Sequence, residues 1–248
     1  YNDYVDLNKN FGFGTPTGDP FTIGLWFKAV ELNGSDDQLI GRYDGSDDVW
    51  QICLNSGGDG DQIRTAYRGV AGTSKQMTSD IDFNTWYYVS MTYDSSGYGY
   101  LYLNGNLMDS ITDVPADFTD SAEIHIGNRG GDNTEYFHGY MDEVKIYPYA
   151  RSASEIKADY NAGLSGMKSN TGVSASFGGS SDKWMSDGLV GYWKFDESAT
   201  TSGAIDSSGN GNDGTYVGNA STTAGKFGNG FVGDGVDDYV DVGTQIAP

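Results

Sequence analysis

The feature that most constrains this 248-residue chain is a strand-like string that occurs twice, near its two ends. VDDYVDVG at residues 236–243 and YNDYVDLN at 1–8 agree, by identity or close similarity, at six of eight positions. The later copy closes residues 188–243, here called the C-terminal block, which has the pattern of the beginning of a β domain although it stands at the end of the chain. We therefore expect a tandem repeat cut out of phase, a permuted domain, or a domain completed by a neighbour.

Apolar and polar residues alternate over residues 1–149, and clusters of Gly, Asn and Asp interrupt them, which predicts a succession of short strands. In one of these strands, Trp50, Ile52 and Leu54 share one face. The pair Asn104-Gly105 is typical of a type I′ turn between two strands. The strands that we expect with the clearest bounds lie at 21–30, 39–43, 49–55 and 62–69.

One stretch has the spacing of a helix. Ser152 is a suitable N-cap, Glu155 follows three residues later, and Ile156 and Tyr160 are spaced by four. About a dozen short strands with one short helix near 152–160 predict an all-β fold of two packed antiparallel sheets.

The charge of the chain bounds its partners. The chain has 35 acidic and 14 basic residues and a formal charge of −21. This charge argues against nucleic acid as a partner, because binding of phosphates needs clustered Lys and Arg. The acids either form a solvated surface, suited to a salty or extracellular setting, or some of them ligate calcium. No apolar run approaches the roughly 18 residues of a membrane span. With Cys53 as the single cysteine, no internal disulfide can form.

Several longer motifs occur together. They are FTIGLWFKA at 21–29, YLYLNGN at 100–106, HGYMDEVKIYPYARSASEIKADYNAG at 138–163, GLVGYWKFDE at 188–197, DSSGNGNDGT at 206–215 and KFGNGFVGDGVDDYVDV at 226–242. In concert they resemble the laminin-G-like domains, most closely the bacterial and archaeal extracellular branch. The resemblance implies an all-β, two-sheet antiparallel jelly-roll sandwich of the concanavalin A-like type.

The order of the motifs departs from that family, in which the C-terminal block would come before residues 1–163. The chain then consists of a sandwich body at 1–163 without its first strands, a Gly/Ser-rich linker at 164–187, and opening strands at 188–248. A strand without a neighbour exposes a row of unpaired amides. We therefore expect 189–195 to pair with 143–149 and complete the sandwich.

The residues expected in this assembly strand are Leu189, Val190, Tyr192 and Trp193, facing Val144 and Ile146. Completion within one chain and completion on a neighbouring chain are both feasible, because the linker is long enough for either. The duplicate strands at 1–8 and 236–243 favour the neighbour, because a domain closed within one chain needs only one of them.

Oxygen donors are concentrated in the loop that begins at Asp206. Calcium favours such a mixture of carboxylates, amides and carbonyls. Pairing of 189–195 with 143–149 would bring two further acids near this loop. The alternative is that Asp and Asn side chains here only form Asx turns. The predicted calcium ligands are Asp206, Asn210, Asn212, Asp213, Asp142 and Glu143.

A second set of residues has the chemistry of a sugar site, in which aromatic rings stack and Arg side chains donate hydrogen bonds. These candidates are Arg42, Trp50, Arg64, Tyr67 and Arg68. Trp50 and Tyr67 also fit strand patterns, so core packing is the alternative for both.

The sequence predicts no catalytic residues. Glycoside hydrolases of this fold place paired acids on one face of a strand, whereas Asp142-Glu143 and Asp196-Glu197 are adjacent and should project to opposite faces. No nucleophile motif accompanies His125 or His138.

The function expected from the resemblance is non-catalytic. It is a secreted or cell-surface module for recognition and adhesion, with calcium as cofactor and a glycan or cell-surface protein as partner. The alternative is a structural subunit of an extracellular filament or tandem array, in which copies associate head-to-tail by strand complementation.

Overall fold

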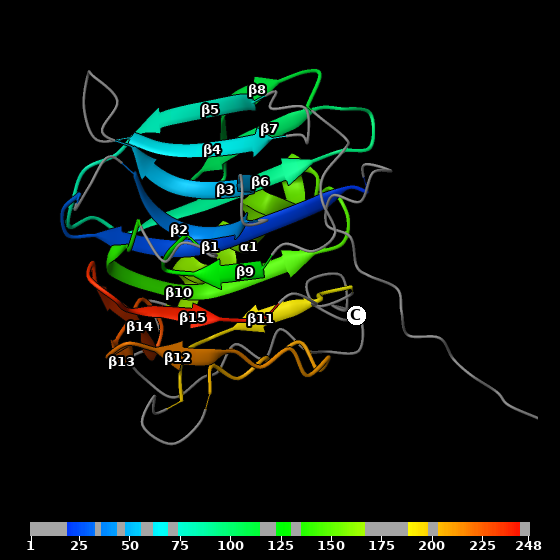
Figure 1. The fold of residues 1–248 in the computed structure, drawn as a ribbon. Helices are drawn as coiled ribbons and strands as arrows, with labels where there is room; N and C mark the ends of the chain where they lie inside the picture. Colours follow the sequence, from blue (N-terminus) through cyan, green and yellow to red (C-terminus); the bar gives the residue numbers. More distant parts are fainter. Residues whose placement is uncertain are drawn as a thin grey trace, which may run out of the picture.

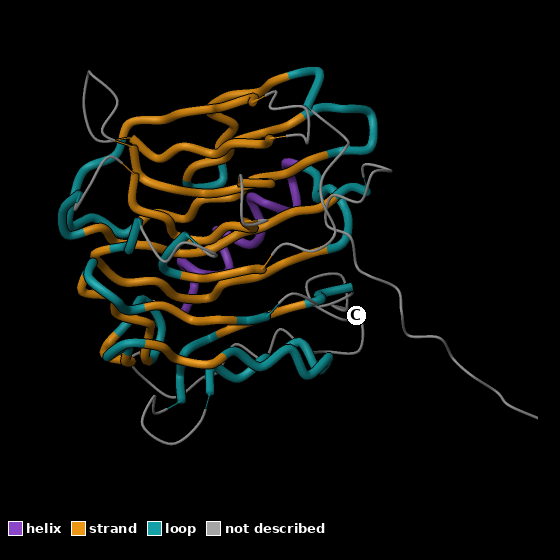
Figure 2. Tube along the Cα trace, viewed as in Figure 1, coloured by secondary structure: helices purple, strands orange, loops and turns teal. Residues whose placement is uncertain are grey.

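The computed structural model confirms the predicted fold class. Two antiparallel sheets lie face to face, and one helix, α1 (Ala153–Gly166), lies against the outer face of one sheet (Figures 1 and 2). The strand expected at 1–8 lies outside the described residues. Those residues are 19–32, 36–43, 48–55, 62–68, 74–114, 123–129, 135–166, 188–197 and 203–243.

The eight-stranded sheet has the order β13–β14–β10–β1–β6–β7–β8, and β11 also pairs with β10. Its strands are β1 (Phe21–Ala29), β6 (Tyr87–Tyr93), β7 (Gly99–Leu103), β8 (Asn106–Ile111), β10 (His138–Tyr147), β11 (Gly191–Trp193), β13 (Ser221–Ala224) and β14 (Asn229–Asp234). The seven-stranded sheet has the order β12–β15–β9–β2–β3–β4–β5. Its strands are β2 (Asp36–Tyr43), β3 (Asp48–Asn55), β4 (Gln62–Arg68), β5 (Ser74–Asp80), β9 (Glu123–Ile126), β12 (Thr215–Val217) and β15 (Tyr239–Asp241).

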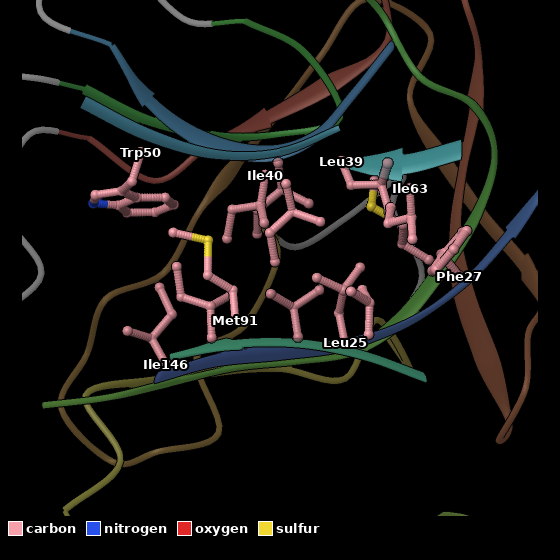
Figure 3. Close-up of a cluster of buried hydrophobic side chains, with 14 of the residues drawn as sticks. Leu25, Phe27, Leu39, Ile40, Trp50, Ile63, Met91 and Ile146 are labelled. Atoms are coloured by element: carbon pink, nitrogen blue, oxygen red, sulfur yellow. The ribbon is translucent and has the colours of Figure 1, made fainter. Parts of the chain in front are cut away.

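The core fills the space between the sheets. Figure 3 shows Leu25, Met91 and Ile146 of one sheet pointing toward Ile40 and Trp50 of the other. The alternation predicted for β3 is confirmed, because its Trp, Ile and Leu side chains at 50, 52 and 54 belong to this core. Burial of that face therefore fixes which side of each strand faces inward.

The hairpin between β7 and β8 is also confirmed. Asn104 and Gly105 have φ values of 52° and 70°, the left-handed values that a type I′ turn requires at both central positions. In α1, the Ser152 amide donates to Glu155 Oε2 at 2.8 Å, as expected for a capping box.

The helix is longer than the sequence predicted. It continues past Tyr160 to Gly166, so residues 164–166 belong to α1 and not to the linker. Gly163 extends the buried face, because a Cβ there would lie 2.7 Å from the ring of Trp26. Residues 167–187 lie outside the described part of the chain.

The C-terminal block contributes strands to both sheets. β11 pairs with β10, with Trp193 opposite Val144, and β14 pairs with the first half of the same strand. β15 pairs with β9 in the other sheet. The sequence predicted a strand over 189–195, whereas the observed strand, β11, includes only residues 191–193. It ends before Phe195, because a φ of 61° there is not compatible with an extended backbone.

The block also completes the core. Six of its larger apolar side chains are buried between the sheets: Val190, Trp193, Phe195, Phe231, Val240 and Val242. Full burial of one such side chain contributes about 1.5–3 kcal/mol, so the set contributes on the order of 10 kcal/mol. That is comparable to the roughly 5–15 kcal/mol by which a whole domain is stable.

We therefore predict that deleting 188–248 abolishes cooperative unfolding of the remaining chain, because the deletion opens the edges of β9 and β10 and uncovers the core. Thermal melting followed by circular dichroism, together with size-exclusion chromatography, measures this effect. Residues 188–243 added as a separate peptide should restore a folded complex. Deletion of 244–248 alone is the control. A monomeric deletion product that melts cooperatively would contradict the prediction.

Candidate functional site

A β-bulge in β10 places two acids on one face of the strand. Gly24 of β1 pairs with Lys145 and Trp26 with Asp142, so two residues of β10 lie opposite Leu25. Glu143, the first of these two, has a φ of 54°. Met141 and Val144 both point into the core, and both acids between them point outward. The prediction that Asp142 and Glu143 project to opposite faces is therefore wrong.

The two acids contact different parts of the C-terminal block. Asp142 is fully buried, and its Oδ2 accepts a hydrogen bond from the Phe227 amide at 2.7 Å. Burial raises the pKa of this carboxyl to about 8, so it carries a proton at neutral pH. Glu143 accepts a short hydrogen bond from the Tyr192 hydroxyl and forms an ion pair with Lys145 at 3.1 Å.

A pocket of about 330 Å³ lies on this face of the eight-stranded sheet. Its walls come from β1, β6, β10 and α1 of the body, and from the C-terminal block. The body contributes Trp26, Tyr88, Glu143, Lys145, Asp159, Ala162 and Gly163. The block contributes Leu189, Tyr192, Ser207, Ser208 and Phe227. The pocket is thus complete only when the block is seated on the body.

Aromatic rings form its apolar wall. Trp26 stacks on Tyr160 of α1, with ring centroids 5.6 Å apart, and Tyr88 lies 5.5 Å from the same ring. Phe227 meets it edge-on at 5.7 Å. Lys226 places its Nζ 4.6 Å from the centre of the Trp26 ring, a cation–π contact from the block to the body. This wall is therefore tightly packed.

The polar groups of the pocket are held in ion pairs. Asp159 accepts a hydrogen bond from Arg151 at 3.0 Å, and both side chains are buried. Burial raises the pKa of Asp159, and the Arg151 charge opposes that rise. Oδ2 of Asp159 has no hydrogen-bond partner, although the residue is only 5% exposed. A buried acceptor without a donor is costly, and this oxygen has almost no surface open to a ligand in the pocket.

The loop that follows β11 is organised by Asp206. Its Oδ1 accepts hydrogen bonds from the amides of Tyr192 and Ser208, at 2.9 and 2.8 Å. Its Oδ2 accepts from the Ser208 hydroxyl at 2.7 Å and from the Asn212 amide at 3.0 Å. Asp213 in turn accepts from the Asp206 amide at 2.8 Å. Both oxygens of Asp206 thus accept two hydrogen bonds each, as in an Asx turn.

The side-chain amides of this loop also form hydrogen bonds within the C-terminal block. The Asn210 side chain donates to Leu189 O at 2.7 Å, and the Asn212 side chain donates to Val190 O. The Trp193 indole donates to Asn212 O at 3.0 Å. These bonds fasten the loop to the strand that carries Trp193 and favour the turn interpretation for this loop.

The predicted calcium set is not gathered into one group. Within the described ranges, one group of three acids brings its ligand atoms within 4.8 Å of one another: Asp234, Asp237 and Asp238, none of which was predicted. The Asp206 carboxylate fits a calcium ligand poorly, because four N–H and O–H donors already surround it. Calcium at the Asp206 loop was the expectation from the sequence; the hydrogen bonds favour its alternative, an Asx turn, and the response of an Asp206 variant to calcium distinguishes the two.

Two of the predicted sugar ligands lie in the core. Trp50 and Tyr67 are fully buried between the sheets, and the Tyr67 hydroxyl donates to Thr92 O at 2.5 Å. They cannot stack on a ligand at the surface, so the ligand role given to them is wrong and the alternative of core packing is correct.

The three arginines of that set are scattered. Arg42 is 3% exposed, and Arg64 forms an ion pair with Asp36 at 2.7 Å. Arg68 belongs to β4, but its side chain is outside the described part. No described residue of the predicted set lines the pocket.

The sequence of β10 contains a pattern that could have predicted the bulge beside the pocket. In β10 the apolar core positions are Met141, Val144 and Ile146, so their spacing changes from three to two. Such a change of phase within a strand indicates a bulge. Trp26 and Asp159 had no comparable signal, because their meeting depends on how α1 packs.

Comparison with known proteins shows what this arrangement is similar to. The family model for laminin-G-like domains, described as the concanavalin A-like lectin/glucanases superfamily, matches residues 1–157. The resemblance inferred from the motifs is therefore confirmed. The displaced order of the C-terminal block stays a prediction. No curated protein sequence matches the chain.

Solved structures resemble this chain to different degrees, and one of them exceeds a TM-score of 0.5. A candidate carbohydrate-binding protein from Bacteroides ovatus superposes with a TM-score of 0.52 at 20% identity, over 87% of this chain and 52% of that one. The binding domain of botulinum neurotoxin serotype G gives 0.49 at 17% identity, over 60% and 38% of the two chains. A SAP-like pentraxin from Limulus polyphemus gives 0.48 at 14% identity, over 58% and 70%. The chain thus spans about half of the Bacteroides protein and less of the toxin chain.

We predict that Asp206→Ala lowers the melting temperature by roughly 5–10 °C, because four hydrogen bonds to a carboxylate are lost. The loss should be the same in calcium and in chelator. Glu31→Ala, at an exposed acid outside both acidic loops, is the control and should change little. A loss seen only in calcium would show that the loop is held by the ion and not by its own hydrogen bonds.

Proposed function

This chain belongs to the concanavalin A-like lectin/glucanases superfamily, and from that premise we propose that it is a module that binds carbohydrate without cleaving it. The observation that carries the proposal is the pocket between the body and the C-terminal block. It combines an aromatic wall with the carboxylates of Glu143 and Asp159, each of which is held in place by a cation.

Sugars have apolar C–H faces and polar hydroxyl edges, so they need both kinds of wall. Tyr88 and Phe227 supply apolar surface on one side of the pocket. Its volume of about 330 Å³ is at the small end for ligand pockets, which favours one or two sugar units. A rigid aromatic wall also lowers the entropy cost of binding.

Hydrogen-bonding groups surround the same space. Glu143 and Asp159 accept, Lys145 donates, and Ser207 and Ser208 line the wall contributed by the block. The ion pairs with Lys145 and Arg151 hold these two carboxylates in a fixed orientation, as a site for hydroxyls requires. Several donors and acceptors around so small a space favour polyhydroxylated ligands.

Two features favour binding without turnover. Glycoside hydrolysis needs a protonated acid and a second carboxyl group on opposite sides of one bond. Burial raises the pKa of two acids on this face: Asp142 is not part of the pocket wall and its Oδ2 accepts a hydrogen bond from the Phe227 amide, and Asp159 is paired with Arg151. Glu143 and Asp159 are each held by a cation.

A secreted or cell-surface location suits the family and the strongly acidic surface, so the proposed partners are glycans on cells or on extracellular proteins. The helix in the described residues is not long and apolar enough to cross a membrane. The charge of −21 disfavours nucleic acid.

A structural subunit of a filament or array is the second candidate. One observation supports it: the C-terminal block adds strands to both sheets of the body. A block seated on a neighbouring copy would make the same contacts head-to-tail. A monomeric mass at micromolar concentration would favour the binding module, and a ladder of oligomers would favour the array.

We predict that a glycan array detects binding and that Glu143→Gln weakens it by roughly 10-fold or more, because the variant removes a charged acceptor from the pocket. Glu31→Gln makes the same chemical change at an exposed site and should leave binding unchanged. No glycan that binds should release product. Equal affinity of both variants, or turnover of any bound glycan, would contradict the proposal.

A further inference from the structure

Three acids lie close together where the chain passes from one sheet to the other. β14 pairs with β10 in the eight-stranded sheet, and β15 pairs with β9 in the seven-stranded sheet, so residues 235–238 connect the two sheets (Figure 1). Asp234 ends β14, and Asp237 and Asp238 come directly before β15. One carboxylate oxygen of each acid lies within 4.8 Å of the other two. Acids this close repel one another when no cation lies between them.

The surrounding protein charges do not balance this group. No Lys or Arg in the described part of the chain forms an ion pair with any of the three acids. Burial raises the pKa of Asp238, and the charges of Asp234 and Asp237 raise it further, whereas hydrogen bonds from the backbone of Asn219 and Asp234 oppose the rise. A cation at this place would cancel the repulsion and favour the charged form of the acids.

One oxygen of Asp238 has no partner within the protein. The residue is only 4% exposed, and its Oδ2 accepts a hydrogen bond from the Asp234 amide at 3.2 Å. Its Oδ1 is buried and has no hydrogen-bond partner among the described residues. A buried carboxylate oxygen without a partner costs free energy, and a bound cation would offset that cost.

The burial of this oxygen is compatible with an ion as its partner. Calcium lies about 2.4 Å from its ligand oxygens, closer than the roughly 2.8 Å of a hydrogen-bonded water. Oxygens that are packed around the position of an ion therefore leave no surface open to water. Asp234 and Asp237 are both exposed, so the group is open to solvent on their side.

The local backbone holds the acids in place and leaves oxygens available. Asp234 Oδ1 accepts a hydrogen bond from the Val236 amide at 2.8 Å, which orders the turn. A Cβ on Gly218 would lie 2.3 Å from the Asp237 carbonyl oxygen, so the turn between β12 and β13 packs closely against the connection. The Asp206 loop differs, because four donors already surround the Asp206 carboxylate.

The donor atoms favour calcium. A set made of carboxylate oxygens selects a hard cation, and calcium accepts six to eight oxygens in irregular arrangements. Two oxygens on opposite sides of a calcium ion are about 4.8 Å apart, compared with about 4.1 Å for magnesium. Magnesium also demands a nearly ideal octahedron, which a short turn between two strands is poorly suited to supply.

We propose that Asp234, Asp237 and Asp238 bind one calcium ion at the connection between the two sheets. The ion joins the end of β14 to the beginning of β15, and these strands pair the C-terminal block with β10 and β9 of the body. Bound calcium therefore stabilises the seated block, because a ligand stabilises the state that binds it. None of the three acids lines the pocket, so this inference is independent of carbohydrate binding.

The test measures calcium binding to the full chain after treatment with a chelator and its removal. Calcium chloride should give one binding event in isothermal titration calorimetry. It should also raise the melting temperature by roughly 3–10 °C at about 10–100 times its dissociation constant. Asp237→Asn should weaken calcium binding roughly 10-fold or more, because the exposed side chain supplies a ligand charge and no described hydrogen bond. Equal calcium affinity of this variant and the unchanged chain would overturn the proposal.

Asp80→Asn is the matched control. It makes the same chemical change at an exposed acid of β5, at the other end of the seven-stranded sheet, and should bind calcium as the unchanged chain does. Asp206→Ala should also keep the calcium response; loss of that response would place the ion in the other loop and contradict the proposal. Magnesium chloride at the same concentration should raise the melting temperature less, and an equal rise would contradict the assignment to calcium.

A second variant separates ion binding from a structural role of the buried acid. In chelator, Asp238→Asn should melt at or above the temperature of the unchanged chain, because it removes a buried charge beside two other acids. In calcium it should melt below the unchanged chain, because it no longer holds the ion. A loss of the same size in both conditions would show that Asp238 only supports the turn, and the proposal would then be wrong.

Discussion

The backbone edges of β9 and β10 are the constraint on which the rest of this structure depends. β1 covers one edge of β10, and β2 covers one edge of β9. The other edge of each strand would expose a row of amides and carbonyls if the body stood alone. The C-terminal block pairs with both edges at once and buries Trp193 and Phe231 in the core. Completion of the backbone pairing and of the core is therefore one event.

The proposed binding pocket also depends on the pairing of the C-terminal block with the body. The Tyr192 amide of the block donates to Asp206 and the Tyr192 hydroxyl donates to Glu143. Its ring makes cation–π contacts with Lys145 and Lys194. One residue thus connects the turn network of the block to the acid on the bulge of the body. A ligand that contacts both walls favours the state in which the block is seated, because binding stabilises the state that binds. Recognition and assembly are therefore linked in the proposed function.

How far the sequence predicts this structure depends on the range of the interactions involved. Local patterns succeeded: the alternation in β3, the turn at Asn104 and the cap at Ser152 each depend on a few neighbouring residues. The site was harder to predict, because a bulge shifts the alternation of side chains along β10 and places Asp142 on the same face of the sheet as Glu143. The pocket joins residues more than a hundred positions apart, and no local pattern marks them. Residue chemistry alone selected Trp50 and Tyr67, which the core requires for packing.

Hydrogen exchange of the intact chain, measured by mass spectrometry at peptide resolution, tests the central claim most directly. If the C-terminal block completes both sheets, the amides of β11, β14 and β15 should be protected nearly as strongly as those of β1 and β6, because they open only with the whole domain. Rapid exchange throughout 188–243, while β1 and β6 remain protected, would contradict the claim. It would show that the body holds its fold without the strands that this account requires.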